Sequence, residues 1–128
     1  MKLDFQKDGY LFLTYDTSKL CKDTIFLKTT QNTRYYDKLE VKPETITVDD
    51  FISFWVLDKM KVVGVTGTNG KTTVTAAIYS FLLDLDEKPA LQGTRGLFAQ
   101  EKRIEEKSMT TPSILETLHN MKQTMDLG

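Results

Sequence analysis

The fold is most clearly indicated by the segment Lys61-Val62-Val63-Gly64-Val65-Thr66-Gly67-Thr68-Asn69-Gly70-Lys71-Thr72-Thr73. Its first half is a continuous apolar run, which is typical of a strand covered on both faces, as in a parallel sheet. After the glycines, apolar residues recur at helical spacing and form one stripe: Val74, Ala77, Ile78, Phe81, Leu82 and Leu85. The sequence therefore predicts a strand over 61–66, a glycine loop and a helix, in that order.

The glycine loop has the residue types that bind a chain of phosphates. Gly67 and Gly70 let backbone N–H groups approach an anion, and the positive end of the following helix lies beside them. Lys71 would reach the β and γ phosphates, and the Thr72 hydroxyl would hold Mg²⁺. The predicted nucleotide-binding residues are Gly67, Thr68, Asn69, Gly70, Lys71, Thr72 and Thr73, with Lys71 as the catalytic residue and Thr72 as the metal ligand.

This loop is a variant of the general phosphate-binding pattern, because Val65 stands where that pattern has its first glycine. A solvated Lys71 in a plain glycine turn is the simpler interpretation, but the flanking strand and helix favour nucleotide binding. A GTPase or simple kinase should carry a magnesium-binding Asp after a later strand, and Asp84 instead falls within the helical stripe. The G-x-G-x-x-G pattern of dinucleotide binding is absent from the sequence.

Two further segments follow the predicted helix. Residues 89–92 predict a second short strand, which would complete a right-handed β-α-β unit. The charged segment 97–107 is expected to be a hairpin or a surface excursion. Ser113 and Glu116 have capping-box spacing and begin a last helix, whose predicted apolar face carries Ile114, Leu118, Met121 and Met125.

The N-terminal part predicts a small β-rich module. Three segments rich in β-branched and aromatic residues are separated by polar turns, at 10–15, 24–27 and 45–48. Asp49 and Asp50 are expected to cap a helix from Phe51 to Met60. The predicted fold class is α/β, with a β-rich module over 1–60 and the start of a P-loop parallel-sheet domain over 61–128.

The composition argues against several classes of protein. A net charge of -1, with 27% charged residues of both signs, gives no basic surface for nucleic acid. No apolar run approaches the roughly 20 residues that span a bilayer, and Met1 to Asp8 lacks the apolar core of a signal peptide. The single cysteine, Cys21, can form no internal disulfide. We therefore expect a cytoplasmic monomer without a nucleic acid or membrane partner.

The motifs resemble those of a known family. The segment from Val65 to Thr73 resembles the ATP loop of the Mur ligases, which build the peptidoglycan peptide, and folylpolyglutamate synthetases have a related loop. Gly93-Thr94-Arg95-Gly96 and Met109-Thr110-Thr111-Pro112 are similar to the G-T-x-G and T-T-P motifs of the MurE branch. Asp16-Thr17-Ser18 stands where that branch usually has Asp-Ser-Arg.

The resemblance implies an ATP-dependent, Mg²⁺-assisted C–N ligase of peptidoglycan synthesis, and hence of cell wall biogenesis, cell shape and cell division. ATP would phosphorylate the D-glutamate side carboxylate of UDP-MurNAc-L-Ala-D-Glu. The amine of a diamino acid, meso-diaminopimelate by family frequency, would then attack the acyl phosphate. It also implies that Tyr15 and Thr17 lie near the uridine and that Thr110 and Thr111 contact the muramoyl-peptide nucleotide.

The resemblance further implies a longer protein. MurE enzymes continue with a Glu-Val-Ser-Ser-His segment, a carbamylated lysine and a C-terminal domain, and none of these is in this sequence. We therefore expect the gene to continue beyond Gly128 and this chain alone to be inactive. A non-catalytic nucleotide-binding module, and another ligase of the Mur or folylpolyglutamate type, are the alternatives.

Overall fold

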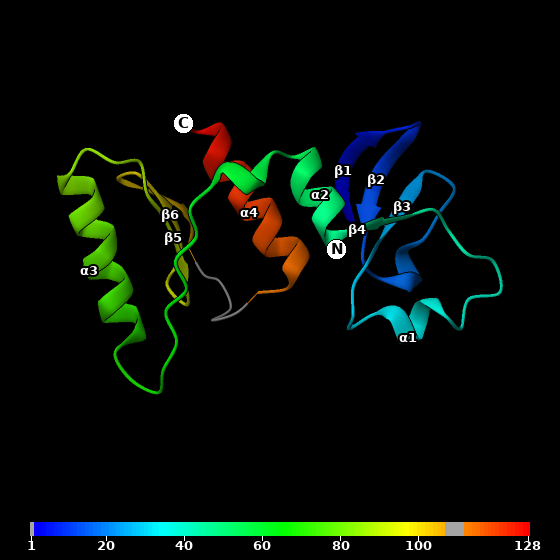
Figure 1. The fold of residues 1–128 in the computed structure, drawn as a ribbon, viewed down its shortest axis with the longest axis horizontal. Coiled ribbons are helices and arrows are strands. Elements are labelled where there is room, and N and C mark those ends of the chain that lie inside the picture. Colours follow the sequence, from blue (N-terminus) through cyan, green and yellow to red (C-terminus); the bar gives the residue numbers. More distant parts are fainter. Residues whose placement is uncertain (1, 107–111) are drawn as a thin grey trace. The chain divides into compact units, whose positions relative to one another are not determined.

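The computed structural model describes residues 2–106 and 112–128 of the chain. Two compact units make up the structure, one over Met1–Val56 and the other over Leu57–Gly128. Each unit contains one small sheet together with helices, so the protein is mixed α/β (Figure 1). Within the described residues, no helix has both the length and the apolar character that a membrane span requires.

A four-stranded sheet organises the N-terminal unit. Its strands lie in the order β1 (Lys2–Lys7), β2 (Tyr10–Thr14), β3 (Thr24–Lys28) and β4 (Thr45–Thr47). The β1–β2 pair is antiparallel, whereas β2–β3 and β3–β4 are parallel. The connections carry the 3-10 helix η1 (Thr17–Lys19) and the helix α1 (Thr33–Tyr36), and α2 (Val48–Phe54) follows β4.

The core of this unit is formed by apolar side chains of the strands and of α2. The ring of Phe5 lies with its centroid 5.5 Å from that of Phe51 and 4.9 Å from that of Phe54. Burial of each large apolar side chain stabilises the fold by about 1.5–3 kcal/mol. The buried apolar residues of the unit are Leu3, Phe5, Leu13, Ile25, Phe26, Leu27, Ile46 and Phe51.

The three strands expected in this unit are confirmed as β2, β3 and β4. The first strand, β1, was not predicted, although buried Leu3 and Phe5 alternate there with exposed Asp4 and Gln6. The helix expected from Phe51 to Met60 is wrong in both bounds, because it begins at Val48 and ends at Phe54.

The start of α2 is set by a different cap from the one expected. The Thr47 hydroxyl accepts a hydrogen bond of 3.1 Å from the backbone N–H of Asp50, so Thr47 is the N-cap. Asp49 and Asp50 lie in the first turn instead, where their negative charge favours the positive end of the helix. The helical path stops before Val56, whose φ of 60° is left-handed.

The C-terminal unit contains a three-stranded antiparallel sheet and two longer helices. The short 3-10 helix η2 (Leu57–Lys59) begins the unit, and α3 (Lys71–Asp84) follows. The sheet has the order β5 (Ala90–Gly93), β6 (Gly96–Ala99) and β7 (Lys102–Glu105), and α4 (Ile114–Asp126) ends the unit. The second strand expected from the sequence is thus confirmed as β5. Of the two alternatives for the charged segment, a hairpin or a surface excursion, the structure has the hairpin of β6 and β7.

The strand expected over 61–66 is not formed. Val62 and Val63 are 72% and 70% exposed, and residues 61–66 have no regular structure. A strand needs a hydrogen-bonded neighbour, and among the described residues the sheet of this unit contains β5, β6 and β7 and no pairing with 61–66. The predicted β-α-β crossover is therefore not observed, and a parallel-sheet P-loop domain is not shown by the described residues.

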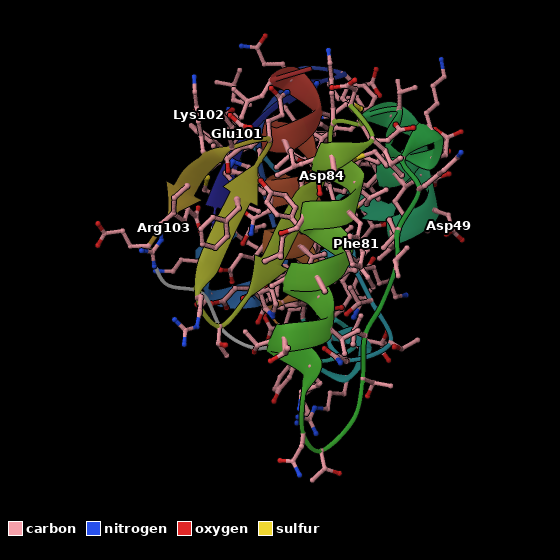
Figure 2. The ribbon with its side chains drawn as sticks, turned by 90° about the vertical axis from the view of Figure 1, so that its left-hand side faces the viewer. Asp49, Phe81, Asp84, Glu101, Lys102 and Arg103 are labelled. Atoms are coloured by element: carbon pink, nitrogen blue, oxygen red, sulfur yellow. The ribbon has the colours of Figure 1, made fainter. Side chains whose placement is uncertain are left out.

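The helix after the glycines is confirmed as α3, but its apolar stripe is not buried. Phe81, labelled in Figure 2, is 65% exposed, and Leu85 and Val74 are 71% and 48% exposed. Another face of the helix lines a pocket beside β5. The residues of this face are Thr72, Thr75, Ala76, Tyr79 and Ser80. These residues recur at offsets of three, four and seven, which places them on one side of a helix.

The last helix, α4, begins where the sequence predicts, but its buried face differs from the predicted one. The Ser113 hydroxyl accepts a hydrogen bond of 3.2 Å from the backbone N–H of Glu116, which confirms the cap. Leu118 is buried as expected, whereas Ile114 is exposed and Leu115 is buried in its place. Polar Asn120 also faces inward, because its side-chain N–H₂ donates a hydrogen bond of 2.8 Å to the side-chain oxygen of Gln92.

Candidate nucleotide-binding site

The glycine loop ends in a conformation that glycine favours. Gly70 is the N-cap of α3 with φ 78°, and Gly67 has φ 143°. No side chain caps this helix start, and no acidic residue lies in the first turn. The first backbone N–H groups of a helix have no partner within the helix, so this end suits an anion. The loop residues Thr68, Asn69, Thr72 and Thr73 are exposed and open to a ligand.

The Lys71 side chain lies over the loop. Its ammonium group donates a hydrogen bond of 2.5 Å to the carbonyl oxygen of Gly67. Behind it, the Thr75 hydroxyl donates a hydrogen bond of 2.6 Å to the backbone carbonyl of Lys71, which anchors the first turn of α3. The positive charge of Lys71 is thus held above the same glycines whose N–H groups would face a phosphate.

A pocket of about 290 Å³ joins this loop to a second motif. Val65, Lys71 and Thr72 line it from the loop and the start of α3, and Gly93, Thr94 and Arg95 line it from the turn between β5 and β6. The sequence marked both motifs but did not indicate that they meet. Their common pocket is the geometric result that the sequence alone could not supply.

The charge of this pocket is positive. Its charged lining residues are Lys71 and Arg95, and no aspartate or glutamate is among the described residues that line it. Such an unbalanced pair of cations favours an anionic ligand, because opposite charges attract most strongly where water is partly excluded. The pocket therefore suits a phosphate or a carboxylate.

The turn that carries Arg95 is held tightly. Gly93 pairs with Gly96 across the hairpin, and Gly96 has φ 120°. A Cβ at Gly96 would collide with the carbonyl oxygen of Glu105 on β7, so only glycine fits there. The Arg103 guanidinium donates to the backbone carbonyls of Arg95, at 2.7 Å, and of Glu106. Figure 2 labels Arg103 on this hairpin.

A tyrosine closes part of the pocket wall. The Tyr79 hydroxyl of α3 donates a hydrogen bond to the backbone carbonyl of Gln100, which ties the helix to the end of β6. Burial raises the pKa of Tyr79, and the nearby negative charge of Glu101 raises it further. The side chain is therefore a neutral donor and a structural link.

The two residues expected near the uridine lie in the N-terminal unit. Tyr15 and Thr17 are half-buried, and the backbone carbonyl of Tyr15 accepts a hydrogen bond of 3.1 Å from the Asn32 side chain. Asp16 between them accepts hydrogen bonds from the Ser18 hydroxyl, at 2.7 Å, and from its N–H, at 2.9 Å. These bonds lower the pKa of Asp16.

The remaining predicted site residues concern the nucleotide substrate and the metal. Thr110 and Thr111 lie outside the described residues. Thr72, the expected Mg²⁺ ligand, lies in the first turn of α3 and lines the pocket. Over residues 2–106 and 112–128, no group of three or more His, Cys, Asp and Glu side chains could hold a metal ion.

Comparison with known proteins gives a consistent family. Residues 65–127 match the Mur ligase middle domain. Three relatives carry the name UDP-N-acetylmuramoyl-L-alanyl-D-glutamate--2,6-diaminopimelate ligase. The Helicobacter pylori protein is 39% identical over 98% of this chain, that of Wolinella succinogenes 39% over 100%, and that of Helicobacter hepaticus 37% over 98%.

The chain spans only part of these relatives, at 29%, 30% and 26% of their respective lengths. The alignments nevertheless cover both units of the structure, and the matching domain begins at Val65, just before the glycine loop. On this similarity, the chain belongs to the Mur ligase family.

Proposed function

We propose that the natural protein is an ATP-dependent ligase that joins 2,6-diaminopimelate to UDP-MurNAc-L-Ala-D-Glu. The observation that carries the proposal is the position of the Lys71 ammonium, which is held over Gly67 at the start of α3, in a pocket whose described lining residues include no carboxylate. The names of three relatives, each aligned over nearly all of the chain, supply the substrates.

In this proposal, the loop binds the phosphates of ATP. The N–H groups of the first turn of α3 face the β and γ phosphates, and the Lys71 ammonium exchanges the Gly67 carbonyl for a phosphate oxygen. The Thr72 hydroxyl would be one ligand of Mg²⁺, which would offset the negative charge of the phosphates. Gly67, Thr68, Asn69, Gly70 and Thr73 complete the cradle.

The proposed reaction has two steps. A D-glutamate carboxylate oxygen attacks the γ phosphorus, the bond to ADP breaks, and an acyl phosphate forms. The diaminopimelate amine then attacks the acyl carbon, phosphate leaves, and the amine proton passes to solvent. Lys71 contributes by stabilising negative charge on the phosphoryl group as it moves, which lowers the barrier.

The two units have separate roles in this proposal. Residues 1–60 bind the UDP part of the substrate, with Tyr15 and Thr17 near the uridine. Residues 61–128 are the first part of a P-loop ATPase domain, in which Thr110 and Thr111 contact the muramoyl-peptide nucleotide. We further propose a monomer that acts in the cytoplasm in peptidoglycan synthesis, as the family does.

The test is an assay of the natural protein with ATP, Mg²⁺, UDP-MurNAc-L-Ala-D-Glu and meso-diaminopimelate. We expect one ADP and one phosphate for each amide formed, measured by chromatography and mass spectrometry. Amide formation with lysine but not with diaminopimelate would contradict the choice of amino acid. An absence of ADP release with every amino acid would contradict the ligase itself.

A further inference from the structure

We propose that Arg95 is a second cation of the phosphate pocket, and that its guanidinium binds an oxyanion of the reactants beside Lys71. The inference rests on the proposed function. Arg95 would be a specificity-determining residue outside the glycine loop, since it belongs to the β5–β6 turn.

The first support is the place of Arg95. It lines the same pocket of about 290 Å³ as Lys71 and Thr72, but it enters from the hairpin and not from the helix. A ligand that occupies this pocket therefore meets one cation from each wall.

The second support is the free state of the guanidinium. Within residues 2–106 and 112–128, the Arg95 side chain has no hydrogen bond, ion pair or ring contact, and it is exposed. By contrast, the Arg103 guanidinium on the same hairpin donates hydrogen bonds to the backbone carbonyls of Arg95 and Glu106. None of the five N–H donors of Arg95 is therefore taken by another described residue.

The third support is the fixed backbone beneath Arg95. Arg103 holds its carbonyl oxygen at 2.7 Å, and the contact of Gly96 with Glu105 leaves no space for another residue type in the turn. A side chain on such a turn loses less freedom when it binds, because its Cα is already in place. An arginine that only faced solvent would not need a backbone held in this way.

The chemistry of the ligand group follows from the side chain. A planar guanidinium offers two parallel N–H donors, which match the two oxygens of a phosphate or of a carboxylate. In the proposed reaction, both groups come together, as the γ phosphate of ATP and as the acceptor carboxylate. Steady-state kinetics separates these sources, because each belongs to a different reactant.

The experiment uses the natural protein with Arg95→Gln and Arg95→Lys. We expect Arg95→Gln to raise the KM of one reactant about tenfold or more, since a hydrogen bond to a charged group is lost. Arg95→Lys keeps the positive charge but lacks the two parallel N–H donors, so we expect a smaller rise in that KM. A higher KM for ATP identifies the phosphate as the partner, and a higher KM for the UDP-linked dipeptide identifies the carboxylate.

The matched control is Lys102→Ala, which removes an exposed cation of the same hairpin that does not line the pocket. Its kinetics should equal those of the unchanged protein. Figure 2 labels Lys102 on this hairpin. A rise in KM of equal size in Lys102→Ala would mean that the overall charge, and not a contact of Arg95, causes the effect, and it would overturn the inference.

A folded Arg95→Gln protein with unchanged kcat and unchanged KM for both reactants would also overturn it. If Arg95→Gln does not fold, as judged by circular dichroism, Arg95→Lys decides by the same criterion. Lys71→Ala, measured in parallel, separates the two proposals. Loss of activity there with no effect at Arg95 removes only this inference. Full ligase activity of Lys71→Ala removes the proposed role of Lys71, whereas the ligase function itself fails only if the unchanged protein releases no ADP with any amino acid.

Discussion

The ammonium group of Lys71 donates a hydrogen bond of 2.5 Å to the carbonyl oxygen of Gly67, four residues earlier in the chain. The acceptor is a neutral carbonyl at an exposed glycine, so the bond is easily exchanged for a better one. A phosphate oxygen is that better acceptor, because it carries negative charge and attracts the ammonium group more strongly than a neutral carbonyl does. The loop thus positions its own lysine before a ligand arrives.

Gly70 tests whether backbone conformation limits the start of α3. A Cβ at Gly70 would meet nothing within 4 Å, but the φ of 78° is left-handed. We expect Gly70→Ala to lower the free energy of unfolding by about 1–2 kcal/mol, measured by denaturant titration. Gly64→Ala is the control, because it has equally open space and no left-handed φ, so its stability should be unchanged. Equal losses in both variants would refute the conformational explanation.

Gly96 tests a steric limit in the hairpin. A side chain there would collide with the backbone carbonyl of Glu105, and the φ of 120° is also unfavourable. We expect Gly96→Ala to lower the free energy of unfolding by about 2 kcal/mol or more, since neighbouring backbone must move. Gly93→Ala, with nothing within 4 Å of its Cβ, should have a much smaller effect. A thermal unfolding curve of Gly96→Ala that matches the unchanged protein would contradict the packing of this turn.

Ser18 in η1 tests the electrostatics of Asp16, the N-cap of this 3-10 helix. Its hydroxyl and N–H lower the pKa of Asp16, so Ser18→Ala should raise that pKa toward the ordinary value through loss of the hydroxyl donor. The lowered pKa gives stability above the ordinary pKa of Asp, and this is lost as the pH falls through the folded value. An NMR titration of the Asp16 carboxyl measures the change. Ser53→Ala, a control in α2, should leave it unaltered.

Local patterns predicted the elements that depend on neighbouring residues in the chain. The strand at β3, the Ser113 cap and the glycine loop before α3 all follow from short-range chemistry. The strand predicted at 61–66 is not formed, because a strand also requires a hydrogen-bonded partner, which the apolar run alone does not reveal. The inner face of α4 differs for a similar reason, since Asn120 faces inward to bond Gln92, which is distant in the sequence.

The candidate site was predictable only in parts. The loop from Gly67 to Thr73 and the segment from Gly93 to Gly96 were each visible as motifs. Their meeting in one pocket depends on how α3 packs against β5, which no single-segment pattern encodes. The role of Arg103, whose side chain holds the carbonyl of Arg95, is likewise a tertiary contact that sequence spacing did not indicate.

Lys71 is proposed to bind the phosphates of ATP. The most direct test measures ATP binding and ligation by the Lys71→Ala variant of the natural protein. Loss of this positioned charge should reduce kcat/KM for ATP at least about a hundredfold, equivalent to about 3 kcal/mol of transition-state stabilisation. The fold should be retained, because the hydrogen bond of the Lys71 ammonium goes to the exposed Gly67 and not to a core residue. Lys59→Ala, at an exposed lysine of η2, should keep full activity. A folded Lys71→Ala protein with the same kcat/KM as Lys59→Ala would contradict the account.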